Sequence, residues 1–365
     1  MSFNIHSFKK DNNEVEFIID DLHFSYINSL RRSILQDIST YGFLNENINI
    51  KSNNSMLNNQ FLSHRISLLP LHNPNKLPLQ DYVFTINKQN NENTVGVVTT
   101  DDFVIRHKNN GDIINTNDIF PHDDITGDPI LLVKLNPRRY NETVYMECVP
   151  TLGTGKDNAA FQCTSQSTYK FVVDKDRAEE EFAKLINDDM SEEEISDIRR
   201  KFDTLDIKRC YYIDEKNNPS KTKFMIESIG PIPPENIPIL ASRSIIERIN
   251  KLEMELSKVD SNTVLFQKSK KHKNAVIIKL INEDDTIANI IKHYIYEHYV
   301  ETGKFSYIGY KRSHMLRDDV TIKVISENGE INEVKAILKE TFEKLKEIYT
   351  MFSQKYRESV IVPQD

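Results

Sequence analysis

Apolar residues with the period of an α-helix lie near the start of the chain, and they limit how this region can fold. The residues that carry this period are Ile27, Leu30, Ile34 and Ile38. Positions three or four apart lie on one face of a helix. Arg31 and Arg32 begin a second, charged face, and Gly42 is a suitable stop after the last apolar residue. The pattern predicts a short amphipathic helix that buries its apolar side.

A second helix is predicted over residues 58–68, after an Asn-rich loop. His64 and Arg65 are neighbours within this helix. We therefore expect that the two basic residues do not share one stripe with Phe61 and Leu68, and that one of them faces solvent or a partner.

One plan of elements occurs twice along the chain. In the first half, a strand within residues 14–22 precedes the first helix, and a strand that ends at Gly230 leads through prolines into a long helix. In the second half, a strand at 276–280 precedes a helix, and another long helix carries Ile331 near its start. The apolar face of the second-half helix is formed by Ile287, Ile290, Ile291, Tyr294, Ile295 and His298.

The composition indicates a globular protein with more than one core. The chain has 365 residues and a mass of 42.5 kDa, which is enough for two or three domains. Its mean hydropathy is -0.52, and no apolar run approaches the roughly 18 residues that a membrane helix needs. The formal net charge is -8, whereas proteins that grip phosphates concentrate Lys and Arg. A membrane span is therefore not predicted, and direct nucleic-acid binding is disfavoured.

The middle of the chain differs in pattern from both ends. Short β-type runs separated by polar turns fill residues 79–174 and predict a mostly β insert domain. Residues 178–206 are strongly charged and predict solvated helices. Residues 260–274 predict a polar linker with a basic cluster at Lys268–Lys273.

Features that could carry chemistry have simpler structural interpretations. The run Gly153-Thr154-Gly155-Lys156 could cradle a phosphate, but Asp157 stands where a phosphate loop has Ser or Thr. The glutamate clusters at 179–181 and 192–194 lack the alternating oxygen ligands of a calcium loop and fit a solvated helix face. The cysteines are Cys148, Cys163 and Cys210. Being scattered and odd in number, they predict neither a disulfide framework nor a zinc site.

Two motifs of the first half resemble the alpha-family assembly subunits of cellular DNA-directed RNA polymerases. They are Asn28-Ser29-Leu30-Arg31-Arg32 and His64-Arg65-Ile66-Ser67-Leu68-Leu69-Pro70-Leu71. The branch with this pattern is the third-subunit branch of archaea and eukaryotes, whose archaeal form is called D. The run at Gly153 and the Glu227-Ser228-Ile229-Gly230 turn before a long helix are similar to further segments of the same branch.

The second half resembles the small alpha-like partner, the eleventh-subunit or archaeal L-like branch. The motifs that carry this resemblance are Asn282-Glu283-Asp284-Asp285-Thr286-Ile287-Ala288-Asn289 and Gly309-Tyr310-Lys311-Arg312-Ser313-His314-Met315-Leu316. Within the first motif, Asp285 or Thr286 is expected to be the helix N-cap. A chain that joins these two branches resembles the fused alpha-like subunits of large cytoplasmic DNA viruses.

The resemblance implies an α+β fold made of two alpha-like dimerisation units, each a small sheet with paired helices. The two units would be fused in one chain as a pseudo-dimer, since each has an apolar helical face too large for its own sheet. The predicted domains are 1–48 with 169–259 as a discontinuous third-subunit-like dimerisation domain, 49–168 as the mostly β insert, 260–274 as the linker and 275–365 as the eleventh-subunit-like dimerisation domain.

The implied function is that of a non-catalytic scaffold that binds the largest and second-largest polymerase subunits. A small tenth-subunit-like zinc protein is a further expected partner, and DNA would be contacted only indirectly, through the complex. No catalytic residue, cofactor, metal or membrane contact is expected. The expected location is intracellular, and for a viral protein it is the host cytoplasm, with its virus factory, and the virion rather than the nucleus.

Two sets of residues are expected to make the interfaces. Contacts to the large subunits are expected from Arg31, Arg32, His64 and Arg65. Arginine suits this role because its guanidinium forms bidentate, charge-assisted bonds, although an ion pair of Arg31 within the chain is an alternative. The internal pseudo-dimer seam is expected to contain Ile27, Leu30, Ile34, Ile287, Ile290, Ile291 and Tyr294. Burial of each residue within its own half is the alternative for this seam.

Two other functions remain open from the sequence. The first is a free-standing DNA-binding transcription regulator that uses the basic cluster at Lys268–Lys273. The second is a nucleotide-dependent transferase that uses Lys156 and an acidic cluster, although no nucleophile and base stand at a recognisable spacing.

Overall fold

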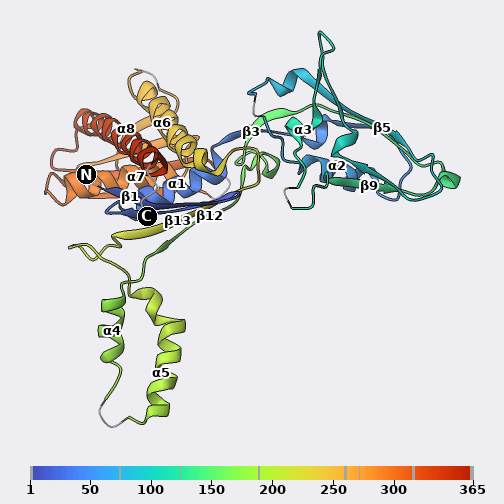
Figure 1. Ribbon diagram of the computed structural model, residues 1–365. Coiled ribbons are helices and arrows are strands. Elements are labelled where there is room, and N and C mark those ends of the chain that lie inside the picture. Colours follow the sequence, from blue (N-terminus) through green and yellow to red (C-terminus); the bar gives the residue numbers. More distant parts are fainter. Residues whose placement is uncertain are drawn as a thin grey trace. The chain divides into compact units, whose positions relative to one another are not determined.

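The computed structural model describes residues 3–73, 75–123, 125–187, 190–258, 261–270, 272–314 and 317–361. Helices and strands are mixed throughout, which confirms the predicted α+β class. The chain divides into two compact units (Figure 1). Unit 1 contains Met1–Ile34, Gln166–Ile226 and Glu235–Asp365, and unit 2 contains Leu35–Ser165 and Glu227–Pro234.

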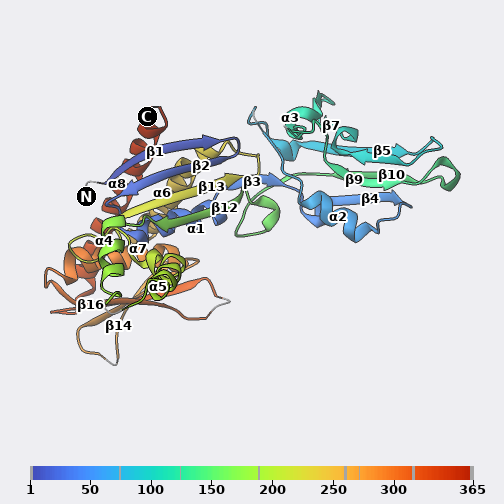
Figure 2. The same cartoon turned by 60° about the horizontal axis from the view of Figure 1, so that its bottom comes forward.

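The first sheet lies mainly in unit 1 and has four strands in the order β1, β2, β13, β12 (Figure 2). Their bounds are β1 Asn4–Asp11, β2 Glu14–Asp20, β13 Lys221–Ser228 and β12 Thr164–Phe171. Burial alternates along β2 and along most of β13, so one face of the sheet is covered. Helix α1, Phe24–Gln36, follows β2 directly and buries Ile27, Leu30 and Ile34, whereas Ile38 is buried beyond its end.

The second sheet of unit 1 repeats this plan with the order β14, β15, β17, β16. The strands are β14 Val264–Lys268, β15 Ala275–Ile281, β17 Asp319–Ser326 and β16 Phe305–Arg312. Helix α7, Asp285–Ile295, follows β15 and contacts β16 and β17. It continues into a π-helical turn, Tyr296–Val300.

Two long helices complete unit 1. Helix α6 runs over Ile237–Leu256 and helix α8 over Ile331–Ile361. They pack side by side (Figure 1), and α8 also contacts α7 and β1. Among the described residues, no helix is both long and apolar enough to cross a membrane.

A helical hairpin lies between β12 and β13. Its helices are α4, Lys175–Ala183, and α5, Glu192–Thr204, which confirms that the charged stretch is helical. The two helices face each other through Phe182 and Phe202, whose ring centroids lie 5.5 Å apart. These rings belong to a small hydrophobic cluster of the hairpin's own.

Unit 2 is mostly β around one hydrophobic core. Its main sheet has the order β4 Ile48–Asn53, β10 Thr143–Cys148, β5 Tyr82–Gln89, β7 Val104–His107, β8 Ile113–Ile114. Two ribbons pair β6 Gly96–Thr99 with β9 Leu131–Leu135, and β3 Ser39–Gly42 with β11 Thr151–Thr154. Its α-helices in the described part are α2, Asn59–Ser67, and the short α3, Thr116–Ile119.

Single turns of 3₁₀-helix join several of these elements. They are Asn45–Asn47, Leu79–Asp81, Thr100–Asp102, Arg138–Tyr140, Ala159–Phe161, Asp206–Arg209 and Pro234–Asn236.

Three local predictions are wrong. Helix α1 ends at Gln36, and Gly42 instead belongs to β3, where a Cβ atom would lie 2.7 Å from the carbonyl oxygen of Ala160. The N-cap of α7 is Asp284, whose carboxylate accepts the N–H of Thr286 at 2.9 Å. Part of the expected linker is strand β14, which pairs with β15, while residues 259, 260 and 271 lie outside the described part of the chain.

Candidate functional site

The residues of the expected seam are all buried. They are Ile27, Leu30 and Ile34 on α1, and Ile287, Ile290, Ile291 and Tyr294 on α7. Burial alone fits both alternatives, because each residue could pack within its own half or across a seam. Only contacts between individual residues of the two halves of unit 1 distinguish these alternatives.

Asp284 is the centre of a charged cluster that joins three helices of unit 1. Its side chain is 6% exposed, and its carboxylate accepts a hydrogen bond from Nη2 of Arg248 on α6 at 2.9 Å. The guanidinium of Arg32 on α1 lies 3.7 Å from the other carboxylate oxygen and donates through Nε to Thr286 Oγ1 at 2.7 Å. Glu283 also binds Arg248, at 2.5 Å. Residues of the first half thus hold the start of α7.

The electrostatics of Asp284 reflect two opposed effects. Burial by itself would raise the pKa of the carboxyl group. The nearby charge of Arg248 and the hydrogen bonds from Arg248 and Thr286 outweigh this effect and hold the pKa below its ordinary value. The carboxylate is therefore charged at neutral pH and compensates a guanidinium that is itself largely buried, with 16% exposure.

Helix α8 makes further contacts between the halves. Tyr349 and Ser29 of α1 share a hydrogen bond of 2.5 Å, and Lys346 binds Glu253 of α6 at 2.5 Å. The ring of Tyr356 packs edge-on against Phe17 of β2, with centroids 5.0 Å apart. The sequence patterns did not indicate α8 as a contact surface, although its helical period was visible, nor did they indicate Asp284 and Arg248 as partners. No short-range pattern links these residues, because their partners are distant in the sequence.

Arg31 and Arg32 are neighbours with different surroundings. Arg31 is half-buried, and its Nε donates to Asn28 Oδ1 at 2.9 Å within the same helix. Within the described residues, Arg31 has no carboxylate partner, so the ion pair expected as an alternative is not formed there. Arg32 is held by Thr286 and Asp284, as described above. The structure brings only Arg32 of these two to the second half.

Helix α2 in unit 2 presents one exposed face. Phe61 is 64% exposed and Leu68 is 52% exposed. His64 and Arg65 are exposed as well, so they lie on the same side as both apolar residues. The expectation that these four could not share a stripe is therefore wrong, because positions i, i+3, i+4 and i+7 form one helix face.

The opposite side of α2 is anchored in the core of unit 2. Leu62 and Ile66 are buried, and Asn58 caps the helix by accepting the N–H of Phe61 at 2.9 Å. Arg65 donates through Nη2 to the carbonyl oxygen of Leu131 on β9 at 2.7 Å. This face therefore combines two basic side chains with exposed apolar groups on a fixed helix, a combination suited to binding another protein.

The glycine-rich run has a structural explanation. Gly153 lies against the ring of Phe161, and Gly155 lies against the carbonyl oxygen of Leu35, so a side chain at either position would collide. The run forms part of the β3–β11 ribbon and is followed by the three-residue turn Ala159–Phe161. A phosphate loop instead opens a helix whose N–H groups face the anion.

The remaining chemical candidates are also structural in form. All three cysteines are free and buried, and burial raises the pKa of Cys148 to about 12 and that of Cys163 to about 11. Such thiols are not activated nucleophiles. In the part of the chain that is described, no group of three His, Cys, Asp or Glu residues could hold a metal ion. Lys268 of the basic cluster pairs with Glu330 on the surface.

Comparison with known proteins bears on the first two thirds of the chain. Residues 16–249 match the model of the RNA polymerase Rpb3/Rpb11 dimerisation domain. The chain is 25% identical over 275 residues to the DNA-directed RNA polymerase subunit Rpo3 of Pyrococcus horikoshii, covering 69% of this chain and 96% of that protein. It is 24% identical over 268 residues to the DNA-directed RNA polymerase II subunit RPB3 of Schizosaccharomyces pombe, covering 67% and 84%.

A third relative matches a shorter region. The chain is 26% identical over 175 residues to the subunit Rpo3 of Methanosphaera stadtmanae, covering 46% of this chain and 61% of that protein. The family match includes most of β2, all of α1 and α2, and Arg248, whereas Asp284, α7 and α8 lie outside it. The chain therefore belongs to the RNA polymerase Rpb3/Rpb11 dimerisation domain family, and it is an alpha-family RNA polymerase subunit.

Proposed function

We propose that this chain is a non-catalytic assembly scaffold of a multisubunit DNA-directed RNA polymerase, and that it supplies both members of an alpha-like pair. Residues 1–48 and 169–259 would form the third-subunit-like dimerisation domain, 49–168 the insert, and 275–365 together with strand β14 the eleventh-subunit-like domain. The observation that carries this proposal is the cluster around Asp284, where Arg32 and Arg248 of the family-matched region hold the start of α7. We propose that this junction is the seam of an intramolecular pseudo-dimer.

The largest and second-largest polymerase subunits are the proposed partners, with a small tenth-subunit-like zinc protein beside them. Arg31, His64 and Arg65 are the proposed contacts, because none of them has a carboxylate partner among the described residues. Arg32 belongs to the same proposed set. A guanidinium has five N–H donors, so the bonds that Arg32 makes within this chain leave donors for a second contact.

The fusion of two branches favours an origin in a large cytoplasmic DNA virus. We propose that the protein acts inside the host cell, in the cytoplasmic virus factory, and is carried in the virion. DNA would be reached only through the assembled polymerase, consistent with the net charge of -8.

Affinity isolation of the tagged protein under mild salt tests the scaffold role. Wild type should recover two very large subunits, and an Arg31→Glu, Arg65→Glu double variant should lose both while it stays folded by circular dichroism. Arg200→Glu is the matched control, since Arg200 is 78% exposed on α5 and forms its ion pair with Asp197 of its own helix. If the double variant still recovered the large subunits, these arginines would not be part of the interface. A wild type that emerges alone would refute the scaffold role.

A DNA-binding regulator remains the second candidate, with the exposed basic residues near Lys268 as its basis. It predicts DNA binding by the isolated protein that weakens steeply as salt is raised.

A further inference from the structure

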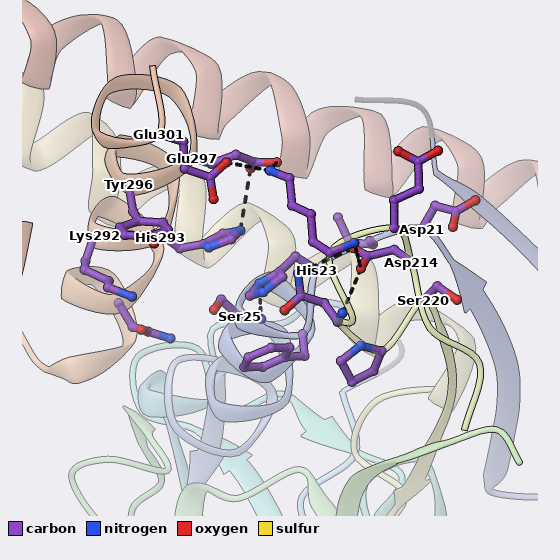
Figure 3. A pocket seen from close by; sticks show the side chains of 17 residues that line it. Asp21, His23, Ser25, Asp214, Ser220, Lys292, His293, Tyr296, Glu297 and Glu301 are labelled. Carbon is purple, nitrogen blue, oxygen red and sulfur yellow. Dashed lines mark hydrogen bonds and ion pairs between the residues drawn. The ribbon is translucent and has the colours of Figure 1, made fainter. Parts of the chain in front are cut away.

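A cavity of about 760 Å³ opens where three segments of unit 1 meet. Its walls are the segment Asp21–Ser25, which leads into the first turn of α1, the turn around Asp214 and Lys216, and side chains from Asn289 on α7 to Glu301 just after the π-helical turn (Figure 3). Neither the contacts around Asp284 nor the exposed face of α2 uses these side chains.

Two stacked imidazoles form a neutral aromatic part of the wall. The rings of His23 and His293 lie 3.6 Å apart at their centroids and are inclined by 12°. Burial lowers the pKa of His23 to about 4 and that of His293 to about 3, so both rings are neutral at neutral pH. Because the backbone N–H of Ser25 donates to Nδ1 of His23 at 3.2 Å, the ring hydrogen of His23 is on Nε2.

The charged groups of the cavity give it an excess of negative charge. Its lining has five carboxylates and two lysines. The charge of Lys216 is already paired, because its Nζ donates to Glu301 at 2.6 Å and lies 4.0 Å from the carboxylate of Glu297. Lys292 lies over the ring of Tyr296, at 5.2 Å from its centroid. The cavity therefore favours an incoming cation.

An unmatched pair of polar atoms lies on the wall. Nε2 of His293 and Oε2 of Glu297 are both buried, and neither makes a hydrogen bond within the described residues. They are 3.7 Å apart, which is too long for a hydrogen bond between them (Figure 3). A buried carboxylate oxygen without a donor costs free energy, and rotation of the side chain towards a donor in the cavity would recover it. The Glu297 side chain as a whole is 30% exposed, so a group in the cavity meets the side chain outside the buried Oε2, and Oε1 lies 4.0 Å from Nζ of Lys216.

We propose that this cavity binds a guanidinium cation carried by an arginine of a partner protein. A guanidinium is planar and presents a rigid set of N–H donors, so it can bond the Glu297 carboxylate and stack on an aromatic ring at once. An ammonium group offers the charge without the plane and stacks less well. This site does not depend on the scaffold role, since the proposed large-subunit contacts lie on other residues.

Calorimetric titration of the full chain with short blocked peptides tests the site. The probe is a Gly-Arg-Gly peptide, and the comparison is the same peptide with citrulline, which keeps the shape and lacks the charge. We expect the arginine peptide to bind at least about tenfold more tightly than the citrulline peptide, because hydrogen bonds to charged groups are the stronger ones. Equal affinities, or no binding of the arginine peptide at about 10 mM, would overturn the proposal.

Two variants locate the binding. Glu297→Gln should weaken binding of the arginine peptide at least about tenfold, whereas Glu343→Gln, which removes the same charge from an exposed position of α8, should not. Asp21→Asn is the second test variant if Glu297→Gln fails to fold, because Asn tolerates the left-handed backbone of position 21. It should also weaken binding. Equal effects of the test variant and the Glu343 control would place the binding outside the cavity.

Competition with spermidine identifies the source of the cation. If spermidine fails to displace the arginine peptide at equal concentration, a protein arginine is supported. If spermidine displaces it and binds more tightly, the partner-protein source is wrong, and the cavity binds a free polyamine.

Discussion

Asp284 is the residue on which three helices of unit 1 converge. It caps α7 through the N–H of Thr286, compensates Arg248 of α6 and lies near Arg32 of α1. A buried ion pair contributes little net stability when intact, but removal of one partner leaves an uncompensated charge. Single substitutions at Asp284 should therefore act on the junction between the halves.

We expect Asp284→Asn to lower the free energy of unfolding by about 2 kcal/mol, because asparagine keeps the helix cap but removes one of the two carboxylates that bind the largely buried guanidinium of Arg248, while Glu283 remains. Urea unfolding followed by circular dichroism measures this change. Asp285→Asn is the matched control, since Asp285 is 39% exposed and lies 4.0 Å from Arg312. Equal losses in the two variants would show that the buried position has no special role.

The stacked histidines should make stability depend on pH. The pKa of His23 falls to about 4 and that of His293 to about 3 in the folded protein, against 6.5 for an unperturbed histidine. Between these values the unfolded chain binds more protons than the folded chain, so stability falls as pH falls from about 6.5 towards 4. We expect His293→Gln to flatten this slope and the exposed His272→Gln to leave it unchanged. If the slope of stability against pH were unchanged in His293→Gln, the stacked histidines would not be its cause.

At the scale of elements, the helical hairpin α4–α5 has a small hydrophobic cluster of its own. We expect Phe182→Ala to destabilise the hairpin by about 3 kcal/mol, since it removes a buried ring. Amide hydrogen exchange should then rise over 175–204 and stay unchanged in β13. Leu185→Ala is the control, because Leu185 is 46% exposed. Faster exchange throughout unit 1 would contradict the separate cluster.

The helices and most strands could be predicted from the sequence because their periods are local. Helices α1, α2 and α6 follow from apolar spacing, and so do α7 and α8. The errors have physical causes. Gly42 was interpreted as a helix stop, but the close approach of Ala160 needs a glycine there. Strand β14 begins with the short apolar run Val264-Leu265-Phe266, which is hidden between polar residues on both sides, and its pairing with β15 is settled only by the folded sheet.

The candidate surfaces were only partly predictable. The motifs indicated the residues Arg32, His64 and Arg65, but not which side of the helix each would face. The contact of Arg32 with Asp284 and the stack of His23 on His293 join positions that are more than 200 residues apart. No local pattern encodes such a pair. The exposed face of α2 was not predicted, because two adjacent residues such as His64 and Arg65 were expected on different faces, although both can border one broad face with Phe61 and Leu68.

At the scale of the whole molecule, unit 1 contains both sheets and both long helices. Fusion would make the pairing of two alpha-like halves intramolecular, so that each half meets its partner at a high effective concentration. A single chain would then always supply the two halves in equal amount. The proposal requires that the contacts themselves, and not only the covalent connection, hold the halves together.

Cleavage of the folded chain between the halves tests this claim most directly. A protease recognition sequence inserted between Lys258 and Ser261 would be cut after folding, and the product analysed by size-exclusion chromatography at low micromolar concentration. The account predicts that both fragments elute together, and that Asp284→Asn weakens their association. Separation of two folded fragments would show that only the chain connection joins them, and would contradict the pseudo-dimer.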